Sequence, residues 1–505
     1  MLNYKSAILL SAVSLMTAAN VNAQAPAQSE DVMLQGFYWN SQNETGWTQL
    51  TAMAEELGEH FTCIWLPPSS SAEGSTTVGG TNVGYHPRIW NDQNSCWGTA
   101  ADLKTLVSTL HDNGVKVIAD IVVNHRAGYT SWVTFPKDDF GKFGTYQLTA
   151  AHVCSTDEVN TDKNAGGEYG TATGAADTGD NWSGARDLDH TSEYVQNDIK
   201  AYLKWLKSEI GYDGWRYDLV KGFSGQYVGM YNDASEPYLS VGEYWDGSYD
   251  NVAAWIEATG KKSMAFDFPA KYAIFNNGLA KNNFSNMSWI EDNTTWRPAG
   301  MIHHANYRRY AVTFVDNHDS YRDDGNKYTG EVSQAYAVLL ASPGIPCVFY
   351  PHWNSSYKVT INKMMEMRKL AGITSESDVV VTQRSSYYES YSQGKNGTLI
   401  CRIGSAAPKE APEGYTQVAV GMNWCYFLDE ACAGVEAIEG DSQEATIGAV
   451  DGGIYVTNPR CEQVRIYTTD GKQVHASDAV ECDVKMAQGI YIVKVGSKAE
   501  KVLVK

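Results

Sequence analysis

The chain is predicted to be an α/β protein whose main unit is a (β/α)8 TIM barrel. From Asp31 onward, short β-rich runs alternate with amphipathic helical stretches, an alternation that is typical of parallel sheets. Eight such units fit into roughly 340 residues, the length of a closed barrel with insertions. Several of the β-rich runs also end in charged residues, as strands do at the carboxyl face of a barrel.

The eight predicted strands are 32–38, 62–66, 116–122, 214–218, 239–241, 263–266, 310–315 and 347–349. The helical patterns that follow them lie around 47–59, 100–113, 192–210, 226–232, 251–259, 270–280, 331–341 and 360–371. The longest interruption follows the third strand and covers residues 126–186. It is rich in Gly, Thr, Asp and Asn, which predicts an inserted loop-rich subdomain.

Residues 1–23 read as a signal peptide. Lys5 precedes a short apolar run, and Val21-Asn22-Ala23 offers small residues at the cleavage positions. The apolar run is too short to span a bilayer, and the sequence shows no other candidate span. We therefore expect a secreted or cell-surface protein, not an integral membrane protein, in which the barrel and its insertion occupy residues 24–372.

After the eighth helix the pattern changes to short strands and turns. Residues 373–431 predict a small antiparallel β domain, and residues 432–444 form a polar linker. Residues 445–505 repeat a V-x-I-Y pattern and contain the hairpin signal Asp470-Gly471. This last segment is predicted to be a separate β-sandwich.

Composition excludes some classes of function. The formal net charge of −20 argues against nucleic acid or anionic membrane surfaces as partners. The nine cysteines show no paired metal-type spacing. A Cys425–Cys432 or Cys461–Cys482 bridge and buried free thiols are both open interpretations in an oxidising compartment.

The fourth predicted strand carries the central chemical signal, Arg216 and Asp218. Residues i and i+2 of a strand face the same way, so these two side chains should project together. A neighbouring guanidinium keeps a carboxylate ionised, as a nucleophile requires. The ends of the third, fifth and seventh strands supply Asn124-His125, Glu243-Tyr244-Trp245 and His318-Asp319.

Asp218, Glu243 and Asp319 should therefore meet at one rim of the barrel. Hydrolysis of a glycosidic bond needs a carboxylate to attack the anomeric carbon and a carboxylic acid to protonate the leaving oxygen. Asp218 suits the first task. Glu243 lies between glycine and two aromatics, surroundings that favour a raised pKa, and suits the second. Asp319 could stabilise positive charge on the sugar, and His125 and His318 could donate hydrogen bonds to its hydroxyls.

Taken together, these strand ends resemble the conserved regions of the α-amylase family of glycoside hydrolases, family 13, in the same order and at similar spacing. The resemblance covers residues 31–430. It implies Asp218 as nucleophile, Glu243 as general acid/base and Asp319 as transition-state stabiliser, with retention of configuration through a covalent glycosyl-enzyme. The segments most similar to the plant and archaeal branches are Gln35-Gly36-Phe37, Trp65-Leu66-Pro67-Pro68, Gly344-Ile345-Pro346 and the Val-Lys-Gly-Phe after Asp218.

The resemblance also implies substrate contacts. Tyr85, in Asn82-Val83-Gly84-Tyr85, is similar to the tyrosine that stacks on the sugar whose bond is broken. Trp245 and Lys221 match positions that bind sugars on the leaving-group side. The implied substrate-binding set is completed by His125, Arg216 and His318.

A Ca²⁺ cofactor follows from the same resemblance. Asn124, Asp177, Asp187 and the carbonyl of Gly222 match the family's calcium ligands, and hard oxygen ligands of this kind would pin the insertion to the barrel. The plant pattern has a further acid where this chain has Asn181. The resemblance therefore implies one structural calcium and gives no support for more.

The end of the chain resembles the C-terminal sorting domains of type IX secretion. The resemblance rests on Asp470-Gly471-Lys472 and on residues 489–496 and 501–505. It implies outer-membrane secretion machinery as a partner. The rival interpretation is a starch-binding module, but the aromatic residues of this segment are only Tyr455, Tyr467 and Tyr491, with no tryptophan to serve as a sugar platform.

The expected function is that of a secreted α-amylase that cuts internal α-1,4 bonds in starch, glycogen and related glucans. Its partners would be an α-glucan polysaccharide or a maltooligosaccharide, and the chain is expected to be a monomer. A glucanotransferase of the same family or a maltodextrin-preferring hydrolase would keep the same site. A non-catalytic glucan-binding protein is the alternative from a different class, but it would not need Arg216 together with three acids.

Overall fold

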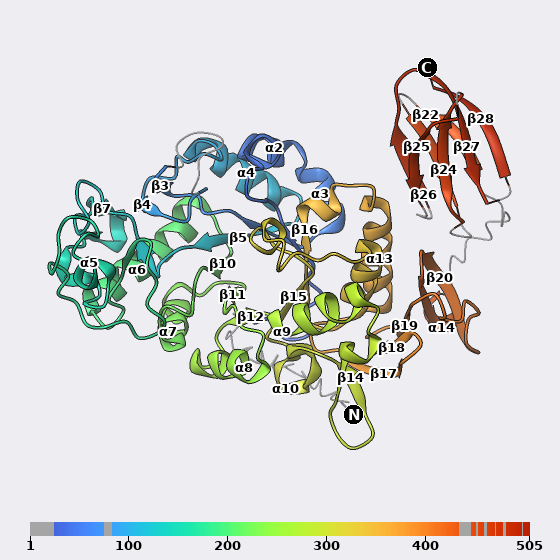
Figure 1. Cartoon of the computed structure of the whole chain (residues 1–505). Coiled ribbons are helices and arrows are strands. Elements are labelled where there is room, and N and C mark those ends of the chain that lie inside the picture. The colour runs from blue at the N-terminus through green and yellow to red at the C-terminus, as the bar shows by residue number, and fades with distance from the viewer. Residues whose placement is uncertain are drawn as a thin grey trace, which may run out of the picture.

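Eight parallel strands close into a barrel in the computed structural model of the chain, which describes residues 25–74, 83–433, 446–450, 453–458, 462–469, 471–477, 481–496 and 498–504. In order around the barrel the strands are β1 (Met33–Gln35), β2 (Cys63–Leu66), β5 (Lys116–Ile121), β10 (Gly214–Tyr217), β11 (Ser240–Gly242), β12 (Met264–Phe266), β15 (Ala311–Phe314) and β16 (Ile345–Phe349) (Figure 1). Each coincides with a predicted strand, so the predicted barrel is confirmed. The predicted signal peptide lies outside the described residues.

Helices lie between the strands on the outside of the barrel (Figure 1). The predicted helices correspond to α4 (Ala100–Asp112), α7 (Gly225–Ser235), α8 (Tyr249–Ala258), α11 (Val332–Ala341) and α13 (Lys358–Ala371). Three short helices were not predicted: α1 (Gln42–Thr45), α10 (Ala305–Arg308) and α12 (Tyr350–Trp353). In α4, Thr99 and Asp102 form a capping box that satisfies the first turn. The buried residues of α4 follow helical spacing and face the barrel: Leu103, Leu106, Val107 and Leu110.

Three predicted helices are interrupted. The stretch 47–59 forms α2 (Trp47–Ala52) and α3 (Ala54–His60), which meet at Met53. The stretch 192–210 is α6 (Glu193–Trp205) followed by a π-helical turn, Leu206–Ile210. The stretch 270–280 is α9 (Phe268–Ala270), a π-helical turn (Lys271–Asn276) and a 3₁₀ turn (Leu279–Lys281). In this third case the break falls at Asn276-Asn277-Gly278, three residues that favour turns over helix.

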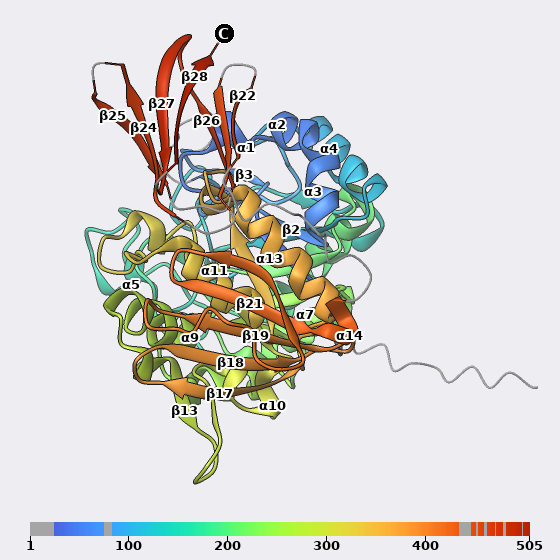
Figure 2. The ribbon, with the colours of Figure 1, turned by 90° about the vertical axis from the view of Figure 1, so that its right-hand side faces the viewer.

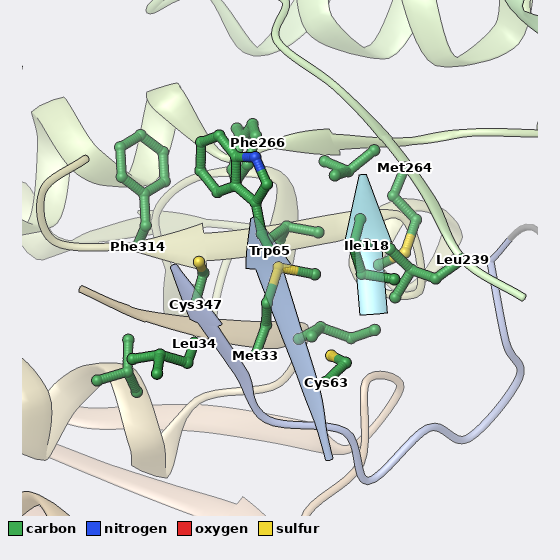
Figure 3. Close-up of a cluster of buried hydrophobic side chains, with 14 of the residues drawn as sticks. Met33, Leu34, Cys63, Trp65, Ile118, Leu239, Met264, Phe266, Phe314 and Cys347 are labelled. Carbon is green, nitrogen blue, oxygen red and sulfur yellow. The ribbon is translucent and has the colours of Figure 1, made fainter. Parts of the chain in front are cut away.

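The barrel strands are buried on both faces, because side chains fill the inside and helices cover the outside. Figure 3 shows side chains from six of these strands in one cluster, with Met33, Trp65, Ile118, Phe266 and Phe314 among them. All five are 1% exposed or less. This packed interior fixes the strands, and so fixes the positions of the residues that follow each strand at its carboxyl end.

The insertion after β5 begins and ends on one short ladder. In that ladder β6 (His125–Arg126) pairs with β9 (Arg186–Asp187), so the two ends of the insertion lie side by side. Its other elements are β7 (Asp138–Asp139), β8 (Thr145–Tyr146) and α5 (Glu158–Thr161), at the left of Figure 1. Two further two-stranded ladders pair β3 (Ser71–Ala72) with β4 (Pro87–Ile89) and β13 (Ser288–Ile290) with β14 (Trp296–Pro298).

Antiparallel sheets follow the barrel. One sheet, across the front of Figure 2, has the order β17 (Asp378–Arg384), β18 (Tyr388–Gln393), β19 (Thr398–Ile403), β21 (Trp424–Asp429), β20 (Tyr415–Gly421) and is followed by α14 (Glu430–Ala433). The tail has two sheets. One contains β22 (Thr446–Val450), β23 (Gly453–Thr457) and β26 (Glu481–Lys485), and the other contains β25 (Gln473–Ser477), β24 (Val464–Thr468), β27 (Gly489–Val495) and β28 (Lys498–Val504). Both tail sheets bury side chains in a common cluster, as the predicted sandwich requires.

Among the described residues, no helix has both the length and the apolar character that crossing a bilayer would demand. Cys425 and Cys432 are free thiols in the structure, so the bridge considered between them is not formed. Cys461, of the second bridge considered, lies outside the described residues.

Candidate active site

A cavity of about 890 Å³ opens at the carboxyl ends of the barrel strands. Its lining brings together six residues singled out from the sequence, namely Tyr85, His125, Asp218, Glu243, Trp245 and Asp319. They come from segments spread over nearly half of the chain, from Tyr85 to Asp319. The barrel topology unites them, because each stands at or beyond the end of a strand or in a loop over the same face.

Arg216 lies beneath this cavity and is fully buried. Its Nη1 donates to Asp218 Oδ1 at 2.6 Å and to Asp120 Oδ1 at 2.8 Å, and its Nη2 lies 2.7 Å from Glu243 Oε1. The strand register explains the arrangement: Arg216 is the direct neighbour of Asp120 across β10 and β5, and Glu243 donates its backbone N–H to Tyr217. One guanidinium therefore holds three carboxylates.

Glu243 is 6% exposed, and its Oε2 accepts from the backbone N–H of Leu219. Burial raises its pKa well above the usual glutamate range; Arg216 acts in the opposite direction, while the charges of Asp218 and Asp319 raise it further. Burial likewise raises the pKa of Asp120 to about 6, against the lowering effect of Arg216. Glu243 can therefore carry a proton under conditions in which an exposed carboxyl group is ionised.

Asp319 has the opposite electrostatics. Burial alone would raise its pKa, but His318 and Arg322 outweigh burial and lower it. His318 Nε2 lies 3.2 Å from Asp319 Oδ2, and the backbone N–H of Asp319 donates to Asn317 Oδ1. The cavity thus combines one carboxyl group disposed to keep its proton and one disposed to lose it, the division that acid–base chemistry on a sugar requires.

Aromatic rings stack beside the cavity; Trp39, Tyr85, His125 and Trp182 line it, and the buried His318 lies behind them. The rings of Tyr85 and His318 are parallel within 2° at 5.2 Å, and Trp39 is parallel to Tyr85 within 6° at 5.8 Å. The Tyr85 hydroxyl donates to Asp120 at 2.9 Å. His125 packs on Trp182 with ring centres 4.3 Å apart, and burial lowers its pKa to about 4, so its ring is neutral near pH 7. Such faces suit the apolar faces of pyranose rings.

Trp245 and Lys221 occupy different positions. Trp245 lines the cavity, where its Nε1 donates to the Tyr272 hydroxyl at 2.8 Å. The Lys221 side chain stands outside the lining; its Nζ lies 3.5 Å from Asp246 Oδ2 and 3.7 Å from Asp180 Oδ2. Of the residues matched to the leaving-group side, only Trp245 therefore faces the cavity.

The four predicted calcium ligands lie together at the root of the insertion. Asn124 Nδ2 donates to Asp187 Oδ1 at 3.1 Å, and a Cβ placed on Gly222 would stand 1.9 Å from Asn124 Oδ1. Burial, with the charge of Asp177 next in weight, raises the pKa of Asp187 to about 8. Among the described residues, no group of three His, Cys, Asp or Glu side chains is placed to hold a metal ion. A cation at this position would therefore depend on amide and carbonyl oxygens as well as on Asp177 and Asp187.

Several residues of the site were missed by the sequence analysis. Asp120 could have been found, because β5 and β10 are adjacent parallel strands and their register pairs it with Arg216. Trp39, Trp182 and Arg322 also line the cavity. Trp39 and Trp182 lie in loops, and Arg322 ends a single 3₁₀ turn, Ser320–Arg322. No periodic pattern in segments this short marks the direction in which a side chain points.

Comparisons with known proteins agree with this geometry. The family model described as "Alpha amylase, catalytic domain" matches residues 45–370. The protein named "Probable alpha-amylase 2" of Arabidopsis thaliana is 32% identical over 376 residues, which cover 70% of this chain and 84% of that protein. "Alpha-amylase 3, chloroplastic" of the same plant is 33% identical over 367 residues, 69% of this chain, but this match spans only 38% of that longer protein.

The crystal structure of an Anoxybacillus α-amylase superposes with a TM-score of 0.51 and covers 94% of this chain and 97% of that chain. At 17% identity this likeness shows the fold. The family-model match and the plant relatives show the family as well. The chain belongs to the α-amylase family of glycoside hydrolases.

Proposed function

We propose that the protein hydrolyses internal α-1,4-glucosidic bonds of starch, glycogen and related glucans, with retention of anomeric configuration. The observation that carries this proposal is the single buried guanidinium of Arg216, which contacts both Asp218 and Glu243 beneath a cavity that Asp319 also lines. Relatives named as α-amylases support the same activity.

In the proposed reaction, Asp218 attacks the anomeric carbon while Glu243 gives its proton to the departing glycosidic oxygen. The carbon–oxygen bond to the leaving sugar breaks, and a covalent bond from Asp218 to the glycosyl unit forms. Glu243, now a carboxylate, takes a proton from water, whose oxygen displaces Asp218. Asp319, as an anion, stabilises the positive charge that develops on the ring.

The remaining residues would hold the sugar. Tyr85 presents a flat face. His125 Nε2 lies 2.9 Å from the Tyr85 carbonyl and His318 Nε2 lies 3.2 Å from Asp319 Oδ2, so each ring would have to leave that partner to donate a hydrogen bond to a sugar hydroxyl. Arg216 Nη1 donates to Asp218 Oδ1 at 2.6 Å and so fixes the direction of the nucleophilic carboxylate. Trp245 would contact sugars on the leaving-group side. Because Lys221 is paired with Asp246, it would have to leave that partner to contact substrate.

We also propose one structural Ca²⁺ held by Asn124, Asp177, Asp187 and the Gly222 carbonyl. The donor set fits the ion, since it is made of hard oxygen atoms, two of them from carboxylates. The ion would supply positive charge between carboxylates and join the insertion to the barrel. No catalytic step needs to pass through it.

Export is a further proposal. Residues 1–23 would direct the chain out of the cytoplasm, and the β-sandwich tail would act as a type IX sorting domain that engages outer-membrane machinery. The tail's repeated strand pattern and its lack of tryptophan support this role over starch binding. The mature enzyme is proposed to act as a secreted or surface-attached monomer.

The test is incubation of purified protein with amylose and, separately, with maltotriose, followed by resolution of product sizes and anomers over time. The proposal expects intermediate-length products from amylose at early times, formed first as α-anomers. In the maltotriose incubation, products longer than maltotriose would identify a glucanotransferase. First-formed β-anomers would contradict retention, and binding without any products would contradict catalysis.

A further inference from the structure

We propose that Arg322 is a substrate-positioning residue, whose guanidinium joins Asp319 to Trp39 across the mouth of the cavity and so sets the direction in which Asp319 receives the sugar. This inference deepens the proposed function and rests on it. The resemblance to the family assigned no role to Arg322 or to Trp39.

The contacts of Arg322 are specific. Its Nε and Nη2 both donate to Asp319 Oδ1, at 3.0 Å and 2.6 Å. Its Cζ lies 3.5 Å from the centre of the Trp39 ring, a close cation–π contact. Trp39 and Arg322 line the same cavity as Asp218 and Glu243. The guanidinium thus has one edge on a proposed reacting carboxylate and one face on the aromatic wall.

These contacts determine which acceptor positions of Asp319 remain for a ligand. An ionised carboxylate offers about four lone-pair positions. Arg322 donates twice to Oδ1, and His318 contacts Oδ2. The acceptor position left for a ligand is therefore on Oδ2 of Asp319. Loss of Arg322 would leave the Asp319 carboxylate free to rotate.

An exposed ion pair usually has little effect, about 0–1 kcal/mol. Two features set this pair apart. The Asp319 side chain is only 24% exposed, although that of Arg322 is 49% exposed. In addition, the guanidinium of Arg322 packs over the ring of Trp39, a residue of a segment far from Arg322 in the sequence. The stack of parallel rings, Trp39, Tyr85 and the buried His318, therefore continues into Arg322.

The experiment compares Arg322→Gln, Arg322→Lys, Trp39→Leu and the double variant Trp39→Leu/Arg322→Gln. For each, kcat and KM are measured with amylose, and maltoheptaose binding is measured by calorimetry in a Glu243→Gln background. Arg322→Gln is expected to lower kcat/KM about 10- to 100-fold, through a lower kcat together with severalfold weaker maltoheptaose binding, as loss of charge-assisted bonds to a group that receives the sugar predicts. Lysine should restore part of this loss, because it keeps the charge but not the planar fork.

If Trp39 acts by holding Arg322, the two changes should not multiply. The factor by which Arg322→Gln lowers kcat/KM should then be at least about fivefold smaller in the Trp39→Leu background than in the wild type. The matched control is Arg384→Gln. Arg384 lies 3.7 Å over the Trp296 ring at the β13–β14 hairpin, outside this cavity, and its loss should leave kcat/KM within about twofold of the wild type.

Three results would overturn the inference: Arg322→Gln that keeps both kcat/KM and maltoheptaose affinity within twofold, fully multiplicative effects of the Trp39 and Arg322 changes, or an equal loss in Arg384→Gln. If the wild type fails to cleave amylose, the proposed function fails. Maltoheptaose binding then decides the positioning role separately, since it needs no turnover: weaker binding in Arg322→Gln supports the role, and unchanged binding contradicts it.

Discussion

Replacement of Arg216 by lysine tests the arrangement on which the proposed chemistry depends. In the wild type, Nη1 of the guanidinium donates to Asp218 and Asp120, and Nη2 contacts Glu243. A lysine ammonium is a compact point charge on a thinner stem and cannot present two nitrogen atoms to opposite sides. At least one carboxylate should therefore lose its partner, and its orientation and charge state should change.

The size of the effect follows from these contacts. A hydrogen bond to a charged group contributes about 1.5–3 kcal/mol, and about 1.4 kcal/mol corresponds to tenfold in rate. Loss of two such contacts gives a decrease in kcat/KM of about 10²- to 10⁴-fold. The free energy of unfolding should fall less than it does when one partner of an ordinary buried ion pair is removed, because burial already raises the pKa values of Glu243 and Asp120. Both groups can then take up protons in place of the lost positive charge.

The assay is release of reducing ends from soluble amylose, with thermal melting followed by circular dichroism to verify folding. Arg368→Lys is the control, because Arg368 is also buried but, within the described part of the chain, its guanidinium donates to backbone carbonyls, those of Leu340, Ser342 and Gly344. It should lower the melting temperature and leave kcat/KM within a few-fold. Folded Arg216→Lys that keeps more than a tenth of wild-type kcat/KM would refute the reasoning, as would an equal loss in the control.

Four further outcomes are expected. Asp218→Asn should remove nearly all amylose hydrolysis without changing the melting temperature by more than a few degrees; near-normal turnover would exclude it as nucleophile. Glu243→Gln should slow substrates with poor leaving groups far more than activated aryl maltosides; equal losses across leaving groups would count against the role. In the wild type, the alkaline decrease in kcat/KM should follow the raised Glu243 pKa, since the acid works in its protonated form. Chelation of calcium should lower the melting temperature, with recovery when Ca²⁺ but not Mg²⁺ is returned; an unchanged melting curve would remove the proposed ion. Deletion of everything after Ala433 should spare activity and starch adsorption, whereas lost adsorption would favour a binding module.

The barrel was predictable because its strands are short apolar runs that stay buried on both faces. Cys63–Leu66 and Ile345–Phe349 have no exposed residue, so their hydrophobicity is continuous and easy to read. The juxtaposition of Arg216 and Asp218 was predictable from strand geometry alone and is confirmed by the 2.6 Å contact. Neither inference required knowledge of distant contacts.

Other features depended on tertiary packing. The break at Met53 and the π-helical turn Leu206–Ile210 lie within patterns that read as continuous helix. The third contact of Arg216, to Glu243, depends on the alignment of β10 with β11. The stack of Arg322 on Trp39 joins the 3₁₀ turn Ser320–Arg322 to the segment that follows β1. Their approach follows from barrel closure, a constraint that no local sequence signal records.

The tail buries its own set of side chains, and among the described residues that set shares no member with the cluster of the barrel. Each unit therefore has the apolar contacts needed for a cooperative melting transition of its own. In thermodynamic terms the two units are separable: heat, denaturant or a protease acting on the sandwich need not loosen the cavity of the barrel, and a different domain could be joined to the sandwich without redesign of either interior.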